Sequence, residues 1–415
     1  MDGDKRRFLT YENAMVAICM LCFGFEMFDR FSITNLSPFM MGDLKLNNAH
    51  LGLIMAVFSL AWGVSGFLGS ILSDLTANKK NLLALFALLS SVFAFLTGLA
   101  QSFIMLVVIR FIMGLFEGPT FPLTQAFALA QSTPRRRGLN MGLISTTSMG
   151  ILANLIAPIV LVALAQAVGW RSTFFLTFIP GAITALLIFK FLKEPDMTKV
   201  AGVEAKPEKA TLKESLKVMK NRNVITSMVF SCFIICWNVG LLTFAPLYLI
   251  HIKGFSPTTM SYIMAAFGVG AVVWGVLVPS LSDRLGRKPM VILFSFLSLI
   301  SPVGLLLAST PLAIGVCAFL GWGGSGVFAL YQAAILGESV DTKYASTAMA
   351  SVQLTGEIGG AVLGVALMGK LADMFGLQAP VVFAAGCLVA ATVIGFAYYE
   401  TAPLILARRR GAKIT

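Results

Sequence analysis

The stretch Leu281-Ser282-Asp283-Arg284-Leu285-Gly286-Arg287-Lys288 ends one long apolar run of the chain and leads into the next. Its first three residues have an earlier copy, Leu72-Ser73-Asp74, which also ends an apolar run. Six apolar runs lie on each side of the polar stretch 194–222, and the copied residues end the second run of each set. The repeat predicts an internally duplicated chain, in which two similar bundles of six helices are joined by a linker.

Each apolar run is long enough to cross a bilayer as a helix, which takes about 20 residues. The expected spans are 14–38, 51–73, 81–100, 102–130, 138–167, 172–193, 223–250, 258–281, 289–308, 311–336, 345–371 and 379–400. The predicted fold class is an all-α polytopic membrane protein with twelve transmembrane helices. We expect a first bundle at 1–193, a cytoplasmic linker at 194–222 and a second bundle at 223–415.

The composition supports a membrane protein and argues against a nucleic-acid partner. The chain has 415 residues, of which 57% are hydrophobic and 12% are charged, whereas soluble domains carry roughly 25% charged residues. The net charge is +12, but the basic residues lie in short loops between apolar runs. That pattern orients membrane proteins and needs no polyanionic partner.

The basic residues also predict the topology. Lys79 and Lys80 follow the second span and Arg135 to Arg137 follow the fourth, while the loops in between hold few or no bases. Because positive loops stay in the cytoplasm, we expect both termini there, with the protein in a bacterial inner membrane. The lysine-rich linker has two open readings, a partly amphipathic helix around 212–219 on the membrane or a solvated tether.

Nothing in the sequence indicates an enzyme, a metal or a cofactor. Cys19-x-x-Cys22 has the spacing of a metal or redox pair, but no second pair accompanies it and the chain has two histidines. We therefore expect the six cysteines to be small packing residues. We also find no nucleotide-binding loop and no arrangement of a nucleophile with a base.

The first span contains charges that need a reason. Asp29 and Arg30 are adjacent in an otherwise apolar run, and a charge at that depth costs at least about 2.5–3.5 kcal/mol on insertion scales. They form either a self-neutralising structural pair or part of an ion or substrate pathway. Glu26, one turn earlier, can reach Arg30 as an i,i+4 pair, with a structural or a site role.

The fourth span carries a second set. Arg110 and Glu117 are seven residues apart, so they share one helix face about 10 Å apart along the axis. Gly114 leaves room on that face, and Gly118-Pro119 loosens the backbone beyond it. Arginine stays charged, so the acids must be the proton carriers. Glu117 is the better candidate for titration, and Asp29 is more readily an ion-pair partner that switches.

The loop Ser282 to Lys288 resembles the cytoplasmic loop motif of the major facilitator superfamily, and Gly169-Trp170-Arg171 also fits that superfamily. In the superfamily the loop acts as a conformational latch. The resemblance gives that role to Asp74, Asp283, Arg284 and Arg287. The first copy lacks the Arg and Gly of the second, which leaves its role open, and a simple topology anchor is the alternative for both.

Phe28-Asp29-Arg30 and Arg110-x6-Glu117-Gly118 resemble the anion:cation symporter family within that superfamily. The resemblance makes Asp29 and Glu117 proton-coupling acids, and Arg30 and Arg110 the groups that bind a substrate carboxylate. Gln353 lies where members commonly present a substrate-binding amide. We add to the expected substrate contacts three residues from other spans: Trp62, Asn238 and Tyr331.

The chain also departs from that family. Glu357 adds an acid where a small residue is usual, and it is either a third proton-coupling group or a structural partner of Lys370 or of the backbone. Trp62 lies where sugar-acid carriers tend to have a hydroxyl or amide. A pocket with fewer hydrogen-bonding groups suits an aromatic or mostly apolar carboxylate better than a sugar acid, although polar residues of other helices keep the sugar acid open.

The expected function is proton-coupled symport of a small organic anion by alternating access, in which two bundles rock about a central site. A proton-coupled antiporter or exporter, or an anion exchanger, is the alternative. The expected partners are the organic anion, protons and the lipid bilayer, and the family resemblance implies a monomer.

Overall fold

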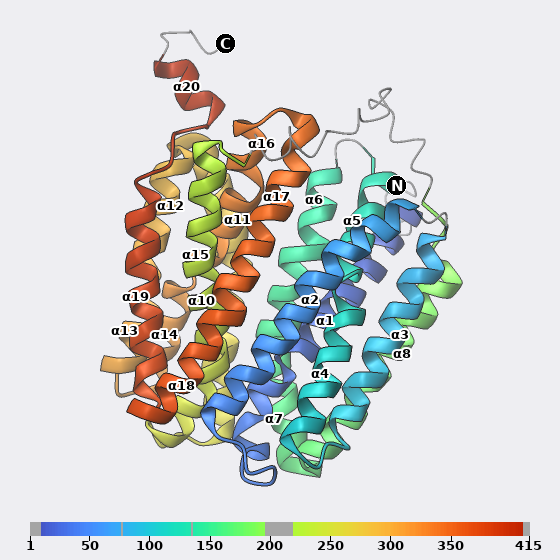
Figure 1. Ribbon diagram of the computed structural model, residues 1–415, viewed down its shortest axis with the longest axis vertical. Coiled ribbons are helices and arrows are strands. Elements are labelled where there is room, and N and C mark those ends of the chain that lie inside the picture. Colours follow the sequence, from blue (N-terminus) through green and yellow to red (C-terminus); the bar gives the residue numbers. More distant parts are fainter. Residues whose placement is uncertain (1–9, 76–77, 134–135, 196–218, 410–415) are drawn as a thin grey trace, which may run out of the picture. The chain divides into compact units, whose positions relative to one another are not determined.

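The computed structural model describes residues 10–75, 78–133, 136–195 and 219–409, and all regular structure within these ranges is helical (Figure 1). The first half contains α1 (Tyr11–Met40), α2 (Asn48–Leu75), α3 (Lys79–Thr97), α4 (Phe103–Glu117), α5 (Thr120–Gln131), α6 (Arg137–Gly142), the π-helical segments η2 (Leu143–Thr147) and η3 (Met149–Ile156), α7 (Ala157–Val168) and α8 (Trp170–Phe191). The predicted amphipathic helix around 212–219 falls almost entirely outside the described residues.

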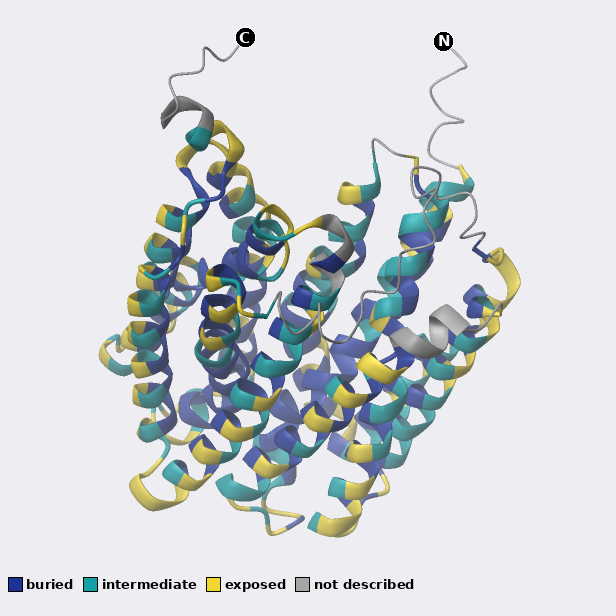
Figure 2. Ribbon diagram, turned by 45° about the horizontal axis from the view of Figure 1, so that its top comes forward, coloured by how far each residue is buried: buried dark blue, intermediate teal, exposed yellow. Residues whose placement is uncertain are grey.

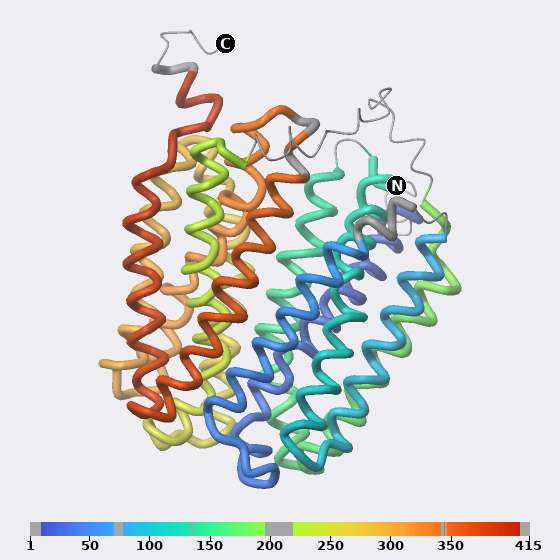
Figure 3. Tube along the Cα trace, in the orientation of Figure 1, coloured from blue at the N-terminus to red at the C-terminus, as the bar shows by residue number. Residues whose placement is uncertain are grey.

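The second half repeats the pattern. It contains α10 (Arg222–His251), α11 (Pro257–Leu285), α12 (Arg287–Leu297), α13 (Ile300–Leu307), α14 (Pro311–Gly321), α15 (Gly324–Ala329), η5 (Leu330–Ala334), α16 (Ile335–Ser339), α17 (Thr342–Gly356), η6 (Glu357–Gly364), α18 (Val365–Phe375), α19 (Gln378–Gly395) and α20 (Pro403–Arg409). Several of the spans are built from consecutive helical segments, as the continuous traces in Figure 3 show.

The twelve-span prediction is confirmed. Eleven helices of the described chain are long and apolar enough to cross a membrane. The remaining span is α1, which is 30 residues long and carries its charges in the interior of the helix. Along most spans, buried and exposed residues occupy different sides of the helix (Figure 2). The exposed sides are rich in large apolar residues, as expected for surfaces that face lipid.

The chain divides into two compact units. Unit 1 comprises residues 1–45 and 60–204, and unit 2 comprises residues 46–59 and 205–415. The first turns of α2 thus belong with unit 2, where Asp373 accepts hydrogen bonds from the backbone N–H groups of Asn48 and Ala49 at 3.0 and 2.9 Å. The predicted boundaries of bundles and linker stay a prediction.

The start of α2 lies close against α18. A Cβ added at Gly52 would lie 3.2 Å from the Cα of Gly369, and one added at Gly369 would lie 2.7 Å from the carbonyl oxygen of Asn48. Any larger side chain would therefore meet backbone, which cannot move aside cheaply. Small residues of this kind allow two membrane helices to approach closely.

Within unit 1, α3 and α8 run side by side and are joined at both ends (Figure 1). Glu194, just beyond α8, accepts hydrogen bonds from the backbone N–H groups of Lys79 and Lys80 at 2.6 and 3.0 Å. At the other end, Arg171 donates to two backbone carbonyls beyond α3, those of Gly98 and Ala100, at 3.1 and 2.6 Å. Each helix end thus meets the charge that its dipole favours.

The fourth span is interrupted where the sequence predicts a loosened backbone. Its helix stops at Glu117 and restarts at Thr120, with Gly118-Pro119 between α4 and α5. A Cβ at Gly118 would lie 2.6 Å from the backbone nitrogen of Gly66 on α2. Ser65 also donates a hydrogen bond to the carbonyl of Gly114 at 3.1 Å. The interruption therefore places Glu117 next to a close contact between α2 and the fourth span.

Candidate functional site

Five charged side chains are buried in the interior of unit 1. Glu26, Asp29 and Arg30 of α1 are 4%, 4% and 5% exposed, and Arg110 and Glu117 of α4 are 1% and 0% exposed. Burying so many ionisable groups between membrane helices is costly unless they serve one another or a ligand. The cluster is the strongest candidate for a functional site in the described chain.

Arg110 links α4 to α1. Its guanidinium donates to the backbone carbonyl of Asp29 at 2.9 Å and to the hydroxyl of Ser32 at 3.1 Å. The guanidinium carbon also lies 5.6 Å from the ring centroid of Phe174 on α8, within range of a cation–π interaction. The family resemblance predicted that Arg110 and Asp29 belong to one site. The hydrogen bond goes to the main-chain oxygen of that residue, and its carboxyl interacts with the guanidinium electrostatically.

Arg30 lies over an aromatic surface. Its guanidinium carbon is 5.0 Å from the ring centroid of Trp62 on α2 and 5.9 Å from that of Phe31. The Trp62 side chain is 9% exposed, and its indole nitrogen has no hydrogen-bond partner. The residues Arg30 and Trp62, both named from the sequence as substrate contacts, are therefore neighbours in unit 1.

The acids of the cluster have unsatisfied oxygens. Both carboxyl oxygens of Glu117, both of Glu26 and one of Asp29 are buried without a hydrogen-bond partner. Glu26 can reach Arg30 by its i,i+4 spacing, but neither of its carboxyl oxygens accepts a hydrogen bond. The Glu26 carboxyl instead lies near Glu117 and the hydroxyl of Thr120, across from α1. Buried carboxyls without partners are costly as ions, so these groups favour bound protons or a cationic or donor-bearing neighbour.

A second polar group lies within unit 2. The side-chain amide of Gln332 donates to Gln353 at 2.7 Å, and that of Gln353 donates to Glu357 at 3.1 Å. Gln332 also donates to the hydroxyl of Tyr331 at 3.1 Å. Glu357 begins η6, a wide-turn segment that periodicity did not predict. Segments of this kind occur frequently at functional sites.

The sequence-predicted residues thus fall into two groups. Unit 1 brings together the side chains of Asp29, Arg30, Trp62, Arg110 and Glu117. Unit 2 brings together Tyr331, Gln353 and Glu357 through Gln332. Asn238 is buried on α10 of unit 2, at 6% exposure.

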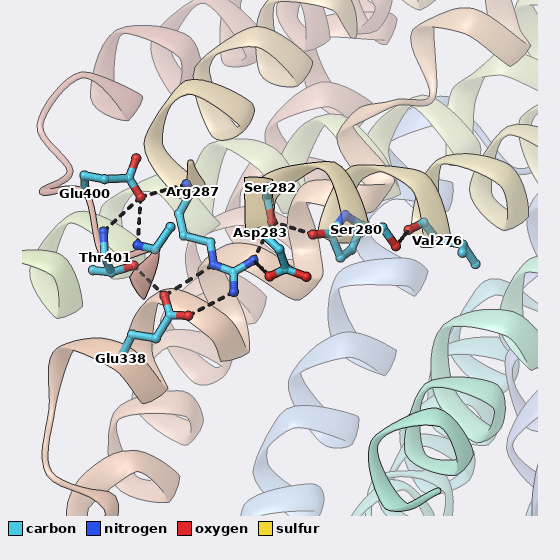
Figure 4. A network of polar contacts seen from close by, with 10 residues as sticks. Val276, Ser280, Ser282, Asp283, Arg287, Glu338, Glu400 and Thr401 are labelled. Carbon is cyan, nitrogen blue, oxygen red and sulfur yellow. Dashed lines mark hydrogen bonds and ion pairs between the residues drawn. The ribbon is translucent and has the colours of Figure 1, made fainter. Parts of the chain in front are cut away.

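The repeated loop motif of the second half forms a polar network (Figure 4). Arg287 contacts the carboxylate of Asp283 at 2.6 Å and that of Glu338 at 2.9 Å. It also donates to the hydroxyl of Ser282. Arg284 is exposed. The side chain of Asp74, the predicted counterpart in the first half, lies outside the described residues.

Sequence reasoning missed one carboxylate of this network. Glu400, beyond α19, accepts hydrogen bonds from the backbone N–H groups of Arg287 and Lys288 at 2.8 and 3.2 Å, at the start of α12 (Figure 4). Glu194 does the same at the start of α3. The sequence does contain a signal, because Glu194 and Glu400 each follow the last span of their half. The helix start that each one binds, however, lies far away along the chain, so spacing could not predict the contact.

The comparisons with known proteins agree with this architecture. A family model described as Major Facilitator Superfamily matches residues 19–362 and 254–413. A probable sulfoacetate transporter of Cupriavidus necator is 29% identical over 298 residues, which cover 68% of this chain and 67% of that protein. The hexuronate transporter of Bacillus subtilis is 30% identical over 241 residues, which cover 57% of this chain and 56% of that protein.

A solved structure shows the same fold. The crystal structure of a D-xylose-proton symporter superimposes with a TM-score of 0.76 at 15% sequence identity, over 95% of this chain and 99% of that one. Twelve helical spans, an internal repeat and a family match across most of the chain lead to one assignment. The chain is a transporter, not an enzyme, and it belongs to the Major Facilitator Superfamily.

Proposed function

We propose that the protein couples the transport of a small organic anion to protons, by alternating access. The observation that carries the proposal is the buried cluster of unit 1, in which two arginines lie among three carboxyls. Arginine cannot lose its proton in this setting and binds carboxylates and sulfonates well. Arg30 and Arg110 are therefore the anion-binding groups of the proposal.

The coupling follows from charge. When an anion joins the two arginines, the acids beside them lose part of the positive field that stabilised their ionised forms. Proton binding to Asp29 or Glu117 then restores neutrality, and a neutral site crosses the apolar interior at lower cost. Because Glu117 has no hydrogen-bond partner on either oxygen, it is the acid that we propose exchanges the proton, with Asp29 as the second.

The names of the relatives support an anionic substrate. Sulfoacetate and hexuronates are both small organic anions, and the proteins named for carrying them are similar to this chain. We propose a substrate of the same class, a sugar acid or an aromatic carboxylate among them. Trp62 beside Arg30 supports a substrate that presents an apolar face.

Unit 2 supplies the remaining proposed roles. We propose Gln353, Asn238 and Tyr331 as further substrate contacts and Glu357 as a third proton-coupling acid. The proposed latch consists of Asp283 with the arginine that it contacts, Arg287, together with Arg284 and Asp74 of the two loop motifs. We also propose cytoplasmic termini, an inner-membrane location and a monomer, from the loop charges and the family resemblance.

Transport in proteoliposomes tests the proposal. We would measure uptake of labelled sulfoacetate, glucuronate and benzoate with an acidic exterior, against glucose as a neutral control. The expected result is accumulation of at least one anion that disappears when the pH gradient is collapsed. Glu117→Gln is expected to lose this accumulation and to keep exchange of internal for external anion, whereas the exposed-site control Asp341→Asn keeps both.

Two outcomes would overturn the proposal. If the wild-type protein accumulates an anion only against a counter-anion, it is an exchanger. If an outwardly directed flux is driven by inward proton movement, it is an antiporter. A Glu117→Gln variant that still concentrates the anion in response to the pH gradient would remove Glu117 from the coupling step while leaving symport intact.

A further inference from the structure

Glu26 is a buried acid that neither the anion-binding groups nor the predicted coupling acids account for. It lies in the middle of α1, 4% exposed, and neither of its carboxyl oxygens has a hydrogen-bond partner. A purely structural role would be served better by an apolar side chain of similar volume, because replacing buried ionic groups in this way is often neutral or stabilising. Its presence in a membrane span therefore calls for a chemical role.

Glu26 lines a small cavity that it shares with Asp29. The two acids are three residues apart on α1, so they lie on one face, separated by about 4.5 Å along the axis. The cavity wall opposite them comes from α3 and α8 and includes Ser90, Ser91 and Thr184, whose hydroxyls donate to carbonyls of their own helices. Its volume of about 10 Å³ is enough for roughly one water molecule. Because both acids line this one cavity, it is suitable for passing a proton between the two carboxyls.

On its other side Glu26 approaches the second coupling acid. The titratable groups that interact with its carboxyl are Glu117 of α4 and Asp29 of the same helix, and Cys22 lies one turn before it on α1. Among the described residues, the hydroxyl of Thr120 on α5 lies near the Glu26 carboxyl, and α3 and α8 contribute Ser90, Ser91 and Thr184 to the shared cavity. Glu26 thus adjoins both the cavity that it shares with Asp29 and the Glu117 carboxyl.

The charge count gives this position a consequence. With every group ionised, the three acids exceed the two arginines by one negative charge, so a neutral empty site holds one proton. A bound monoanion then requires a second proton. Two carboxyls in one dry site share a proton rather than both ionising. One proton therefore stays in the cluster throughout the cycle, and three neighbouring carboxyls are available to hold it.

We propose that Glu26 is a proton relay, which accepts a proton from Asp29 through the shared cavity and passes it to Glu117, and the reverse. The proton leaves one carboxyl oxygen as another arrives, so charge and atoms balance at each transfer. The relay rests on the proposed function, because it serves the coupling of protons to the anion. The relay adds Glu26 to the proton-coupling groups, although Glu26 forms no hydrogen bond with either arginine.

The experiment follows the protons themselves and needs no substrate. Full-length protein in liposomes of phosphatidylethanolamine and phosphatidylglycerol would be studied by infrared difference spectroscopy between alkaline and acidic buffer. Protonated carboxyl groups give a C=O band of their own. Glu26→Gln is expected to remove part of this band. After a pH jump it is expected to slow protonation of the remaining acids by about a hundredfold, the lower end of what a positioned proton-transfer group contributes.

Matched variants separate a relay from a structural role. Glu26→Asp keeps a carboxyl, so its band is expected to shift in frequency and the rate to recover in part. Asp341→Asn removes an exposed carboxyl elsewhere in the chain and is expected to change neither the buried band nor the rate. If Glu26→Gln does not fold, Glu26→Asp alone tests the relay. A carboxyl at position 26 that exchanges its proton shifts the C=O band in the difference spectrum when it is shortened, and one that never exchanges leaves the band unchanged.

The relay and the proposed function fail in different ways. An unchanged difference spectrum and rate in the Glu26 variants would show that Glu26 never exchanges its proton, and would overturn the relay even if wild-type uptake follows the pH gradient. Wild-type protein that shows no gradient-driven uptake of any anion overturns the symport proposal, whatever the spectra show.

Discussion

The two carboxylates that bind helix starts, Glu194 and Glu400, allow a comparison inside one molecule. Each accepts hydrogen bonds from two consecutive backbone N–H groups, at the first turn of α3 and of α12 respectively. Glu194 is exposed and Glu400 is half-buried. Glu400 also accepts from the backbone N–H groups of its own turn at 3.0 and 2.9 Å. We expect Glu400→Gln to destabilise the protein more than Glu194→Gln does.

The magnitude follows from the bonds. A glutamine keeps one acceptor oxygen and turns the other into a donor that faces an N–H group. One hydrogen bond to a charged acceptor, about 1.5–3 kcal/mol, is lost, and the other falls by about 1 kcal/mol. The lost charge at the helix start adds about 0.3–1 kcal/mol. After allowance for partial exposure, we expect roughly 2–4 kcal/mol for Glu400→Gln and roughly 1 kcal/mol for the exposed Glu194→Gln.

The chain supplies its own reporter for this measurement. Four of its cysteines are buried: Cys19, Cys22, Cys236 and Cys387. A thiol-reactive dye in detergent therefore reports unfolding as these side chains become accessible. The melting temperature should fall in the order wild type, Glu194→Gln, Glu400→Gln. An equal or larger loss for Glu194→Gln, or an unchanged Glu400→Gln, would refute the assignment of helix-start stabilisation to burial and bond number.

Three further predictions concern the site, the helix contact and the latch. Ser32→Ala leaves one N–H group of buried Arg110 without its acceptor, so we expect a loss of about 1–3 kcal/mol in stability and weaker binding of any anion that passes the uptake screen, measured by melting temperature and by titration. Gly369→Ala places a methyl group against backbone and should lower the stability of the protein by about 1–3 kcal/mol. Gly386→Ala has nothing within 4 Å of the added Cβ, so it should stabilise its helix by up to about 1 kcal/mol. Equal effects of the two variants on the melting temperature would contradict the close contact between α2 and α18. Arg287 donates two hydrogen bonds to the carboxylate of Glu338, and Arg287→Lys cannot form both. We expect this variant to slow transport severalfold with unchanged anion affinity, so a change in affinity alone would argue against a latch.

The spans were predictable because apolar length is dictated by the bilayer. The run 172–193 predicted a helix that the structure places at Trp170–Phe191, and the run 223–250 one that it places at Arg222–His251. The π-helical segments were not predictable in this way. A wide turn leaves the apolar composition unchanged, so neither length nor periodicity distinguishes η3 or η6 from an α-helix.

The site was predictable as far as motifs and their spacing could place it. The family resemblance grouped Asp29 with Arg110, and the Arg110 side chain donates a hydrogen bond to the backbone carbonyl of Asp29. Spacing could not give the direction of the side chains. The spacing allows Glu26 to reach Arg30, and the structure places Glu26 beside the cavity formed with α3 and α8. That outcome depends on the packing of three helices, which spacing within α1 does not contain.

The double attachment of α3 to α8 has a mechanical consequence. Glu194 holds one end of the pair and Arg171 the other, and between them Gly181 fits so closely against Ser91 that an added Cβ would collide with its hydroxyl. Sliding of one helix along the other would break both attachments, so the pair behaves as a single stiff strut. The cavity wall opposite Glu26 and Asp29 is made by this strut. Its side chains therefore keep their spacing when α3 and α8 tilt together, and the distance across the cavity changes only when this pair and α1 move relative to each other.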